Sequence, residues 1–303
     1  MIKIISLNWR IRYAAIGWTQ YLLRKKVNYL IKEKPLHRWF VPYLLQRSKP
    51  YLKTTPLIGS LALLGATKTK MSADHSDIQD LLQNADQLFD ENQYQEVIDV
   101  LKKHPNYDSD ANILWRLARA LYKLSGTNKA KKEECIKEGF EAITKALEID
   151  ETNYACHKWM AVLLDTKCEL VGIKERVSQL ENVKKHMEKA VELNPNDPTN
   201  WHLLGNFAFG LADMPWYQRK VVSAIFATPP TGTYEEALEY FLKAEQTKAN
   251  FYSMNLLFIG RCYYNLKNKE KAKEYLTRAA EVIVSNEDDK KCKEEATALL
   301  KKL

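Results

Sequence analysis

Apolar side chains recur every three to four residues along most of the chain beyond residue 78, which is the period of amphipathic helices. The clearest stretch runs from Leu256 to Ala279 and falls into two halves. Small residues stand where two antiparallel helices would cross, because they allow the backbones to approach closely. The positions that form this pattern are Leu256, Ile259, Gly260 and Tyr263, followed, after Asn268 opens the second half, by Ala272, Leu276 and Ala279.

One helix pair cannot bury such a surface alone, so the sequence should contain further pairs that stack against it. It does, and the spacing of the recurring positions is that of the tetratricopeptide repeat. We therefore predict an all-α fold, a right-handed superhelix of about five antiparallel helix pairs with a capping helix over residues 288–303. The matching positions are Trp201, Leu204 and Gly205 with Ala237, Phe241 and Ala244; Met160 and Ala161 with Val183, Met187, Ala190 and Pro195; Leu114, Leu117, Ala118 and Leu121 with Gly139, Ile143 and Ala146; and, most weakly, Leu81 and Ala85 with Val97 and Leu101.

The distance between the two small residues of a pair varies along the chain. It is 12 residues from Gly260 to Ala272, but 21, 22 and 32 residues in the three pairs before it. The middle pairs should therefore have longer helices or inserts. The largest insert spans residues 213–233, where Pro215 favours the start of a short helix and Thr233 with Glu236 forms a capping box. Its apolar side chains are Trp216, Val221, Val222, Ile225 and Phe226.

Two interpretations of this insert remain open. We favour one in which it covers apolar surface beside the helix pairs. The other is a lid or a helix that touches a membrane, in which Trp216, Tyr217, Arg219 and Phe226 would be the contacting residues.

Charge is distributed unevenly over the 303 residues. Residues 1–70 contain 14 Lys and Arg but one acidic residue, Glu33, which gives +13, while the remainder carries 32 basic and 37 acidic residues, or −5. A partner attracted by positive charge alone would therefore meet the N-terminus first. Nothing in this distribution favours nucleic acid as a partner of the repeat body.

The composition of residues 1–70 is that of a targeting or anchoring segment. Residues 1–50 are basic, amphipathic and almost free of acid, as in mitochondrial transit segments, and the apolar run from Pro56 to Ala66 would span only about 16 Å as a helix. Three interpretations stay open: a cleaved presequence, a retained anchor on an anionic membrane surface, or a basic arm that binds an acidic protein surface. A polar linker from Thr67 to His75 should follow, with Ser76 and Gln79 as the capping box of the first repeat helix.

The sequence offers no recognisable reactive centre. Its six histidines lack metal-binding spacing, although His157 and His186 could approach each other within the third pair, and the scattered glycines form no phosphate loop. The five cysteines are odd in number and have no CxxC pair, which is typical of reduced thiols. We therefore expect no catalytic residue, cofactor or metal, and no enzyme.

The first helices of a tetratricopeptide array line its concave groove, so the groove can be read from repeat positions 5, 9 and 12. This lining mixes aromatic, aliphatic and cationic side chains, which suits a peptide with an acidic end or a lipid with an anionic headgroup. Alternatively, Trp115 and Phe209 turn into neighbouring helices as core. The positions are Trp115, Arg119, Tyr122, Lys158, Val162, Asp165, His202, Asn206, Phe209, Leu257, Arg261 and Tyr264.

Several segments resemble the regulator of microtubule dynamics family, over about residues 78–285. The likeness is closest to the member that lacks the long phosphatase-interacting N-terminal region. MPWYQRK together with FATPP, in residues 214–230, carries it most specifically, because neither is general tetratricopeptide sequence. The other matching segments are LWRLARA, HKWMAVLL, HMEKAVELNP, TYEEALEYFLKAE and FYSMNLL.

The resemblance implies a non-enzymatic scaffold in the cytoplasm that associates with microtubules and spindle poles. It also leaves an alternative, because the family includes a mitochondrion-anchored relative whose repeat domain tethers organelles and binds phospholipid. As a cytoskeletal adaptor, the chain would hold acidic tubulin surfaces through its basic arm or a local patch. As a lipid-binding module at the mitochondrion, it would hold a phospholipid against Trp115, Tyr122, Phe209 and Tyr264, under the Trp216 insert.

Overall fold

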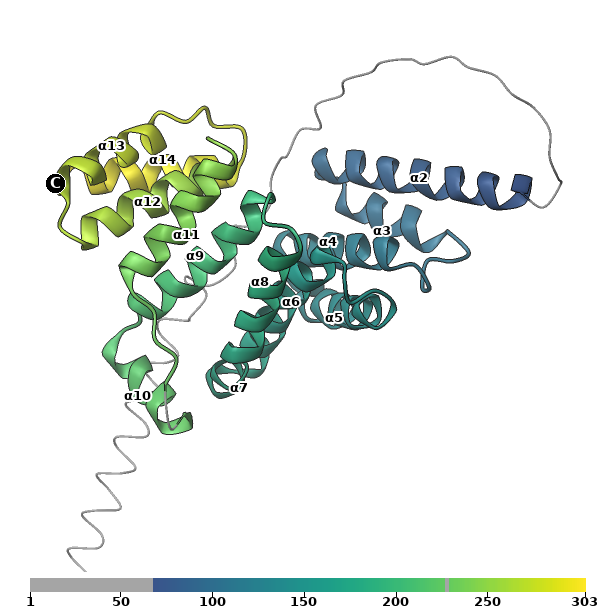
Figure 1. Cartoon of the computed structure of the whole chain (residues 1–303), viewed down its shortest axis with the longest axis horizontal. Helices are drawn as coiled ribbons and strands as arrows, with labels where there is room; N and C mark the ends of the chain where they lie inside the picture. Colours follow the sequence, from purple (N-terminus) through teal and green to yellow (C-terminus); the bar gives the residue numbers. More distant parts are fainter. Residues whose placement is uncertain (1–67, 227–228) are drawn as a thin grey trace, which may run out of the picture.

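The computed structural model describes residues 68–226 and 229–303, and every regular element within them is helical (Figure 1). The predictions for residues 1–67, including the targeting segment and the apolar run, lie outside the described residues. The helices are α2 (Lys68–Asp90), α3 (Tyr94–Lys102), α4 (Ala111–Thr127), α5 (Lys132–Ile149), α6 (Tyr154–Val171), α7 (Ile173–Ser178), α8 (Leu180–Leu193), α9 (Pro198–Ala212), α10 (Trp216–Ile225), α11 (Tyr234–Thr247), α12 (Ser253–Asn265), α13 (Lys269–Ala280) and α14 (Glu287–Leu300), with a 3-10 turn at Lys129–Lys131.

The helices pack in antiparallel pairs that stack into a superhelix, as the repeat pattern predicted. Within the described residues the pairs are α2 with α3, α4 with α5, α6 with α8, α9 with α11, and α12 with α13, and α14 covers the last pair. Figure 1 shows the pairs following one another along a curved path, and each pair packs against the next. This is a helical-repeat superhelix of the tetratricopeptide type.

Glycines stand at two close helix crossings, which explains why those positions are small. A Cβ atom at position 260 would lie 2.7 Å from the side chain of Leu276 on α13, and one at position 205 would lie 2.6 Å from the ring of Phe241 on α11. Neither distance is compatible with ordinary van der Waals contact. Ala237 and Ala272 are fully buried at the same crossings. The sequence rule of small residues at backbone crossings is therefore confirmed.

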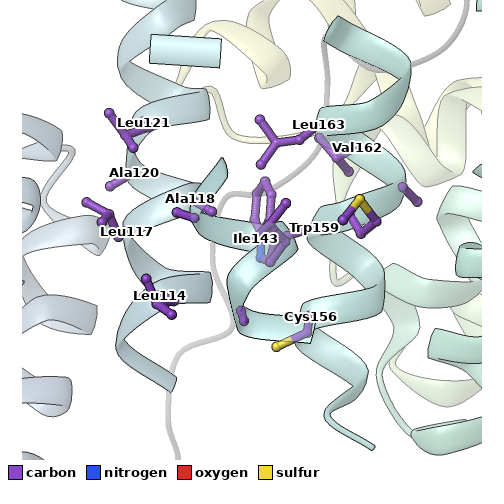
Figure 2. Packing of buried hydrophobic residues seen from close by; sticks show 14 of the residues in the cluster. Leu114, Leu117, Ala118, Ala120, Leu121, Ile143, Cys156, Trp159, Val162 and Leu163 are labelled. Atoms are coloured by element: carbon purple, nitrogen blue, oxygen red, sulfur yellow. The ribbon is translucent and has the colours of Figure 1, made fainter. Parts of the chain in front are cut away.

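The apolar core runs along the whole array in two clusters that meet at α9. The first extends from Leu82 to Val222, and the second from Ala208 to Ala296. Figure 2 shows the first cluster where α4, α5 and α6 meet, with Trp159 and Ile143 between the helices. Nearly all of the repeat-pattern positions are buried, whereas Leu81, Trp201 and Tyr263 are half-buried and Pro195 is exposed.

The long spacing of the middle pairs has the predicted cause. α4, α5 and α6 have 17, 18 and 18 residues, compared with 13 and 12 in α12 and α13. In the third pair the additional helix α7 lies between α6 and α8. In the fourth pair, α10 occupies the insert, and its first helical residue is Trp216, one position later than the proline signal indicated.

The helix starts follow the sequence signals except at the first repeat. Thr233 caps α11, because its hydroxyl accepts a hydrogen bond from the backbone N–H of Glu236. At the other end, α2 already includes Lys68, so Ser76 lies inside a helix and the predicted linker from Thr67 to His75 is wrong. No glycine or proline interrupts residues 68–76, so nothing prevents the helix from extending upstream of the capping signal.

Candidate functional site

At the N-terminal end of the predicted groove, contacts with neighbouring residues of the same chain fix the side chain of Arg119. Its guanidinium lies over the ring of Phe89, 3.8 Å from the centre, and near Trp115, 5.0 Å from the centre. It also forms an ion pair with Asp86, which Arg116 joins at 2.8 Å. Burial would raise the pKa of Asp86, but the two arginines outweigh it and lower that pKa. Arg119 therefore connects α2 to α4.

In the middle of the array, two predicted groove positions are buried ion-pair partners. Lys158 donates to Asp197 over 2.7 Å, and Asp197 also caps α9 by accepting from the N–H of Thr199. Burial would raise the pKa of Asp197, but Lys158 and Thr199 lower it. Asp165 accepts two hydrogen bonds of 2.7 Å from the guanidinium of Arg176, and both side chains are almost inaccessible to solvent. These charges hold helices together.

In the C-terminal half, His202 and Phe209 are core residues. His202 has no exposed surface, and its Nδ1–H donates to Oδ1 of Asn255 over 2.8 Å. Burial lowers the pKa of His202 to about 4, so the ring is neutral at physiological pH. Phe209 packs edge-on against Phe258 and Tyr234. The alternative that Phe209 turns into the core is therefore the one that the structure shows.

The remaining groove residues keep part of their surface exposed. Arg261 lies over the rings of Phe209 and Phe258, and 3.8 Å from the carboxylates of Asp213 and Glu295. Trp115, Tyr122 and Tyr264 are half-buried, while Asn206, like Val162 and Leu257, is buried. The half-buried residues of the predicted lining thus lie towards its two ends, whereas the residues in the middle, and Leu257 at the C-terminal end, are buried. Binding of a peptide or phospholipid to this set stays a prediction.

The predicted insert residues do not form one common surface either. Phe226 and Met214 pack against the core, and Val222 and Gln218 are buried, so this side of α10 covers apolar surface as favoured above. Trp216 and Ile225, expected on the same side, are exposed. The half-buried Tyr217 meets it edge-on, with ring centres 6.1 Å apart. Arg219 is exposed and donates to the backbone carbonyl oxygens of Met214 and Ala212.

His157 and His186 lie closer together than the sequence alone could establish. Their Nδ1 atoms are 2.9 Å apart, and Nε2 of His157 donates to the carbonyl oxygen of Glu151 over 2.8 Å. That second bond places a lone pair on Nδ1 of His157, so Nδ1 of His186 must be the donor. Burial and the neighbouring ring lower the pKa of His186 to about 4. Among the described residues, no group of three or more potential metal ligands exists.

The structure brings together one group of charges that sequence reasoning missed. Lys269 donates to the C-terminal backbone carbonyl of Leu303 over 3.2 Å, so the α12–α13 turn adjoins the end of the chain. Figure 1 shows the C-terminus at this turn. Lysines spaced two to four residues apart on α13 and its turn were the available signal. We call the following exposed residues the lysine cluster: Lys267, Lys269, Lys273, Lys301 and Lys302.

Comparison with known proteins decides the family. A family model described as regulator of microtubule dynamics protein 1-3 matches residues 81–303. The chain belongs to the regulator of microtubule dynamics family. Regulator of microtubule dynamics protein 1 of Bos taurus is 41% identical over 74% of this chain and 72% of its own length. The corresponding protein of Pongo abelii is 38% identical over 85% and 81%, and protein 3 of Rattus norvegicus is 33% identical over 72% and 47%.

A solved structure supports the fold of this regulator of microtubule dynamics family member. A thermophilic TPR protein of Thermus thermophilus superposes with a TM-score of 0.50, at 16% identity, covering 73% of this chain and 98% of its own. At that identity the likeness concerns the fold only. Together with the family match, it makes a helical-repeat scaffold the function class of the chain. None of the described helices is long and apolar enough to cross a bilayer.

Proposed function

We propose that this chain is a non-enzymatic scaffold that binds microtubules through the lysine cluster. The observation that carries the proposal is the gathering of five exposed lysines at one end of a repeat body whose net charge is −5. A local patch of this kind is what an acidic protein surface requires when the body as a whole repels it. The names of the relatives, regulators of microtubule dynamics, point to microtubules as the polymer that supplies such a surface.

The neighbourhood of the cluster supports this choice. The carboxylate of Glu274 is paired with Lys271 at 2.9 Å. Glu270 is the acidic residue nearest in sequence to Lys267 and Lys269. Lys273 follows Lys269 by one helical turn, so both project from one face of α13. Exposed ammonium groups on flexible stems suit flexible acidic segments, because neither side needs a fixed geometry.

Co-sedimentation with stabilised microtubules tests the proposal. A variant with Lys267, Lys273, Lys301 and Lys302 changed to Glu should lose binding, and wild-type binding should fall steeply as salt is added. The matched control changes four exposed lysines elsewhere, Lys103, Lys129, Lys137 and Lys185, to Glu, so that both variants have the same net charge. The control should keep most of its binding.

A third variant separates the cluster from the basic arm. Changing Arg10, Arg12, Arg24, Lys25 and Lys26 to Gln removes five charges from residues 1–70 and leaves the described helices unchanged. If this variant loses binding while the lysine-cluster variant keeps it, the arm is the microtubule-binding element and the proposal is wrong. Binding that stays as strong at high salt as at low salt in all variants would contradict an electrostatic contact altogether.

A further inference from the structure

Helix α10 has an open side that its packing does not explain. Gln218 and Val222 face the array, whereas Trp216, on the other side of the helix, is 66% exposed. Ile225 lies half a turn around the helix from Trp216 and is 39% exposed at the end of α10. Burying an indole ring is one of the largest apolar gains available to a chain, so an exposed tryptophan on a helix that is already docked suggests a contact with another partner.

More exposed apolar surface lies beside α10. Val171, at the end of α6, is 71% exposed, and Leu170 is 40% exposed. They lead directly into α7, which packs against α10, and Figure 1 shows α7 and α10 together at the lower end of the molecule. Four of the eight large apolar side chains exposed on the described residues therefore belong to this end. We call Leu170, Val171, Trp216 and Ile225, with Arg219 and Lys220, the α7–α10 tip.

The charge of α10 has one sign. From residue 214 to residue 234 the sequence contains no acidic residue, and Arg219 and Lys220 are its charged side chains. Arg219 is fixed in an exposed position by its bonds to Met214 and Ala212. The ammonium of Lys220 lies 5.0 Å from the centre of the Trp216 ring. The exposed side of α10 thus combines an indole ring with two cations, although Lys174 and Glu175 of α7 offset each other.

We propose that the α7–α10 tip docks on an anionic lipid surface. Tryptophan is favoured at the boundary between headgroups and hydrocarbon, because it has an apolar body and one hydrogen-bond donor. Arg219 and Lys220 would meet lipid phosphates, while Val171 adds a shallow apolar contact. A few apolar side chains on a protruding end suit shallow insertion better than a protein interface, which needs a broader buried area. This contact goes beyond the proposed function, since the tip is separate from the lysine cluster.

A local probe is needed because residues 1–70 carry +13 and could bind anionic vesicles themselves. All five native cysteines are buried, so a cysteine introduced at the exposed Ser223 of α10 accepts an environment-sensitive dye selectively. On full-length protein, vesicles of phosphatidylcholine with phosphatidylserine should shift the dye emission to the blue, and pure phosphatidylcholine should shift it little. The same dye at Ser285, beside other exposed apolar residues, should not respond.

Two substitutions complete the test. Trp216→Ala should raise the lipid concentration needed for half of the shift roughly tenfold. Lys220→Glu, which reverses an exposed charge and leaves the buried side of α10 unchanged, should weaken the shift and its salt dependence. The matched control is Ile283→Ala, because Ile283 is the most exposed large apolar residue described, at 91%, and lies outside the tip. It should change nothing.

Three results would overturn the proposal. The first is a Ser223 probe that does not respond to anionic vesicles while circular dichroism shows the labelled protein to be folded. The second is an equal loss from Ile283→Ala and Trp216→Ala. The third is a probe that responds to polymerised tubulin but not to vesicles, which would make the tip a protein-docking surface instead.

Discussion

The last helix pair and the third pair are held together by different means. α12 and α13 meet through apolar and small residues, with Gly260 against Leu276. α6, α7 and α8 instead contain the Asp165–Arg176 ion pair and the His157–His186 contact, and Lys158 extends from α6 to Asp197 at the start of α9. The short pair follows the repeat pattern closely, whereas the lengthened one adds specific polar contacts to an apolar core that includes Trp159 and Met187. Repeat signatures therefore describe packing best where the repeat is unmodified.

The largest expected effect comes from breaking the buried ion pair of the third helix pair. Arg176→Met leaves the Asp165 carboxylate without its main partner, and should lower the free energy of unfolding by about 3–5 kcal/mol, measured by urea denaturation. The double variant with Asp165→Leu should be close to wild type, because no charge is then buried. A single variant as stable as wild type would show that the ion pair does not hold α7 to α6.

Acidification should destabilise the protein through its buried neutral histidines. The pKa of His202 is lowered from 6.5 to about 4, so the unfolded chain binds a proton that the folded chain does not between these values. The contribution of neutral His202 to the free energy of unfolding is therefore fully present above pH 6.5, and it falls by about 3 kcal/mol as the pH drops to 4. His186 adds to the same trend. Urea denaturation at several pH values measures this, and His202→Gln should reduce the dependence on pH.

A smaller effect should follow from filling the closest crossing of the last pair. Gly260→Ala places a methyl group against Leu276 and should cost about 1–3 kcal/mol of unfolding free energy, measured by urea denaturation. Gly126→Ala is the matched control, since a Cβ there meets nothing within 4 Å and alanine favours the helix. That control should be slightly stabilising. If both variants behave alike, close backbone approach is not what selects glycine at position 260.

The smallest effect concerns the helix cap of the last pair, and a cap beside the third pair sharpens the contrast between the two pairs. Asn268→Ala removes the acceptor for the N–H of Lys271 at the start of α13 and should cost about 1 kcal/mol. Asp197→Ala removes a similar cap from α9 and also leaves Lys158 buried without its ion-pair partner, so it should cost more. Equal losses in thermal denaturation would mean that the Lys158 pair adds nothing to the cap.

The sequence predicted the fold because packing of this repeat depends on local periodicity. Gly205, Ala237, Gly260 and Ala272 could be assigned to helix crossings from spacing alone, and the structure buries all four. The short helix α7 was not foreseen. Six residues give too little periodicity to distinguish an added helix from a lengthened one.

The site was harder to predict because it depends on contacts between distant segments. His202 sits at a groove position, but the amide of Asn255, 53 residues later, draws it into the core. Asp165 and Arg176 occupy different helices, and their pairing depends on the turn at Gly172, where φ is +138°. The lysine cluster likewise unites Lys269 with a segment 34 residues away. Periodicity indicates which face of a helix is apolar, but not what that face meets.

Zero-length cross-linking between lysine and carboxyl groups on assembled microtubules tests the central claim most directly. Mass spectrometry would then identify which lysines of this chain join tubulin carboxylates. We predict that cross-links concentrate at Lys267, Lys269, Lys273, Lys301 and Lys302, and decrease as salt is added. Cross-links confined to residues 1–70, or spread evenly over the exposed lysines, would contradict the account.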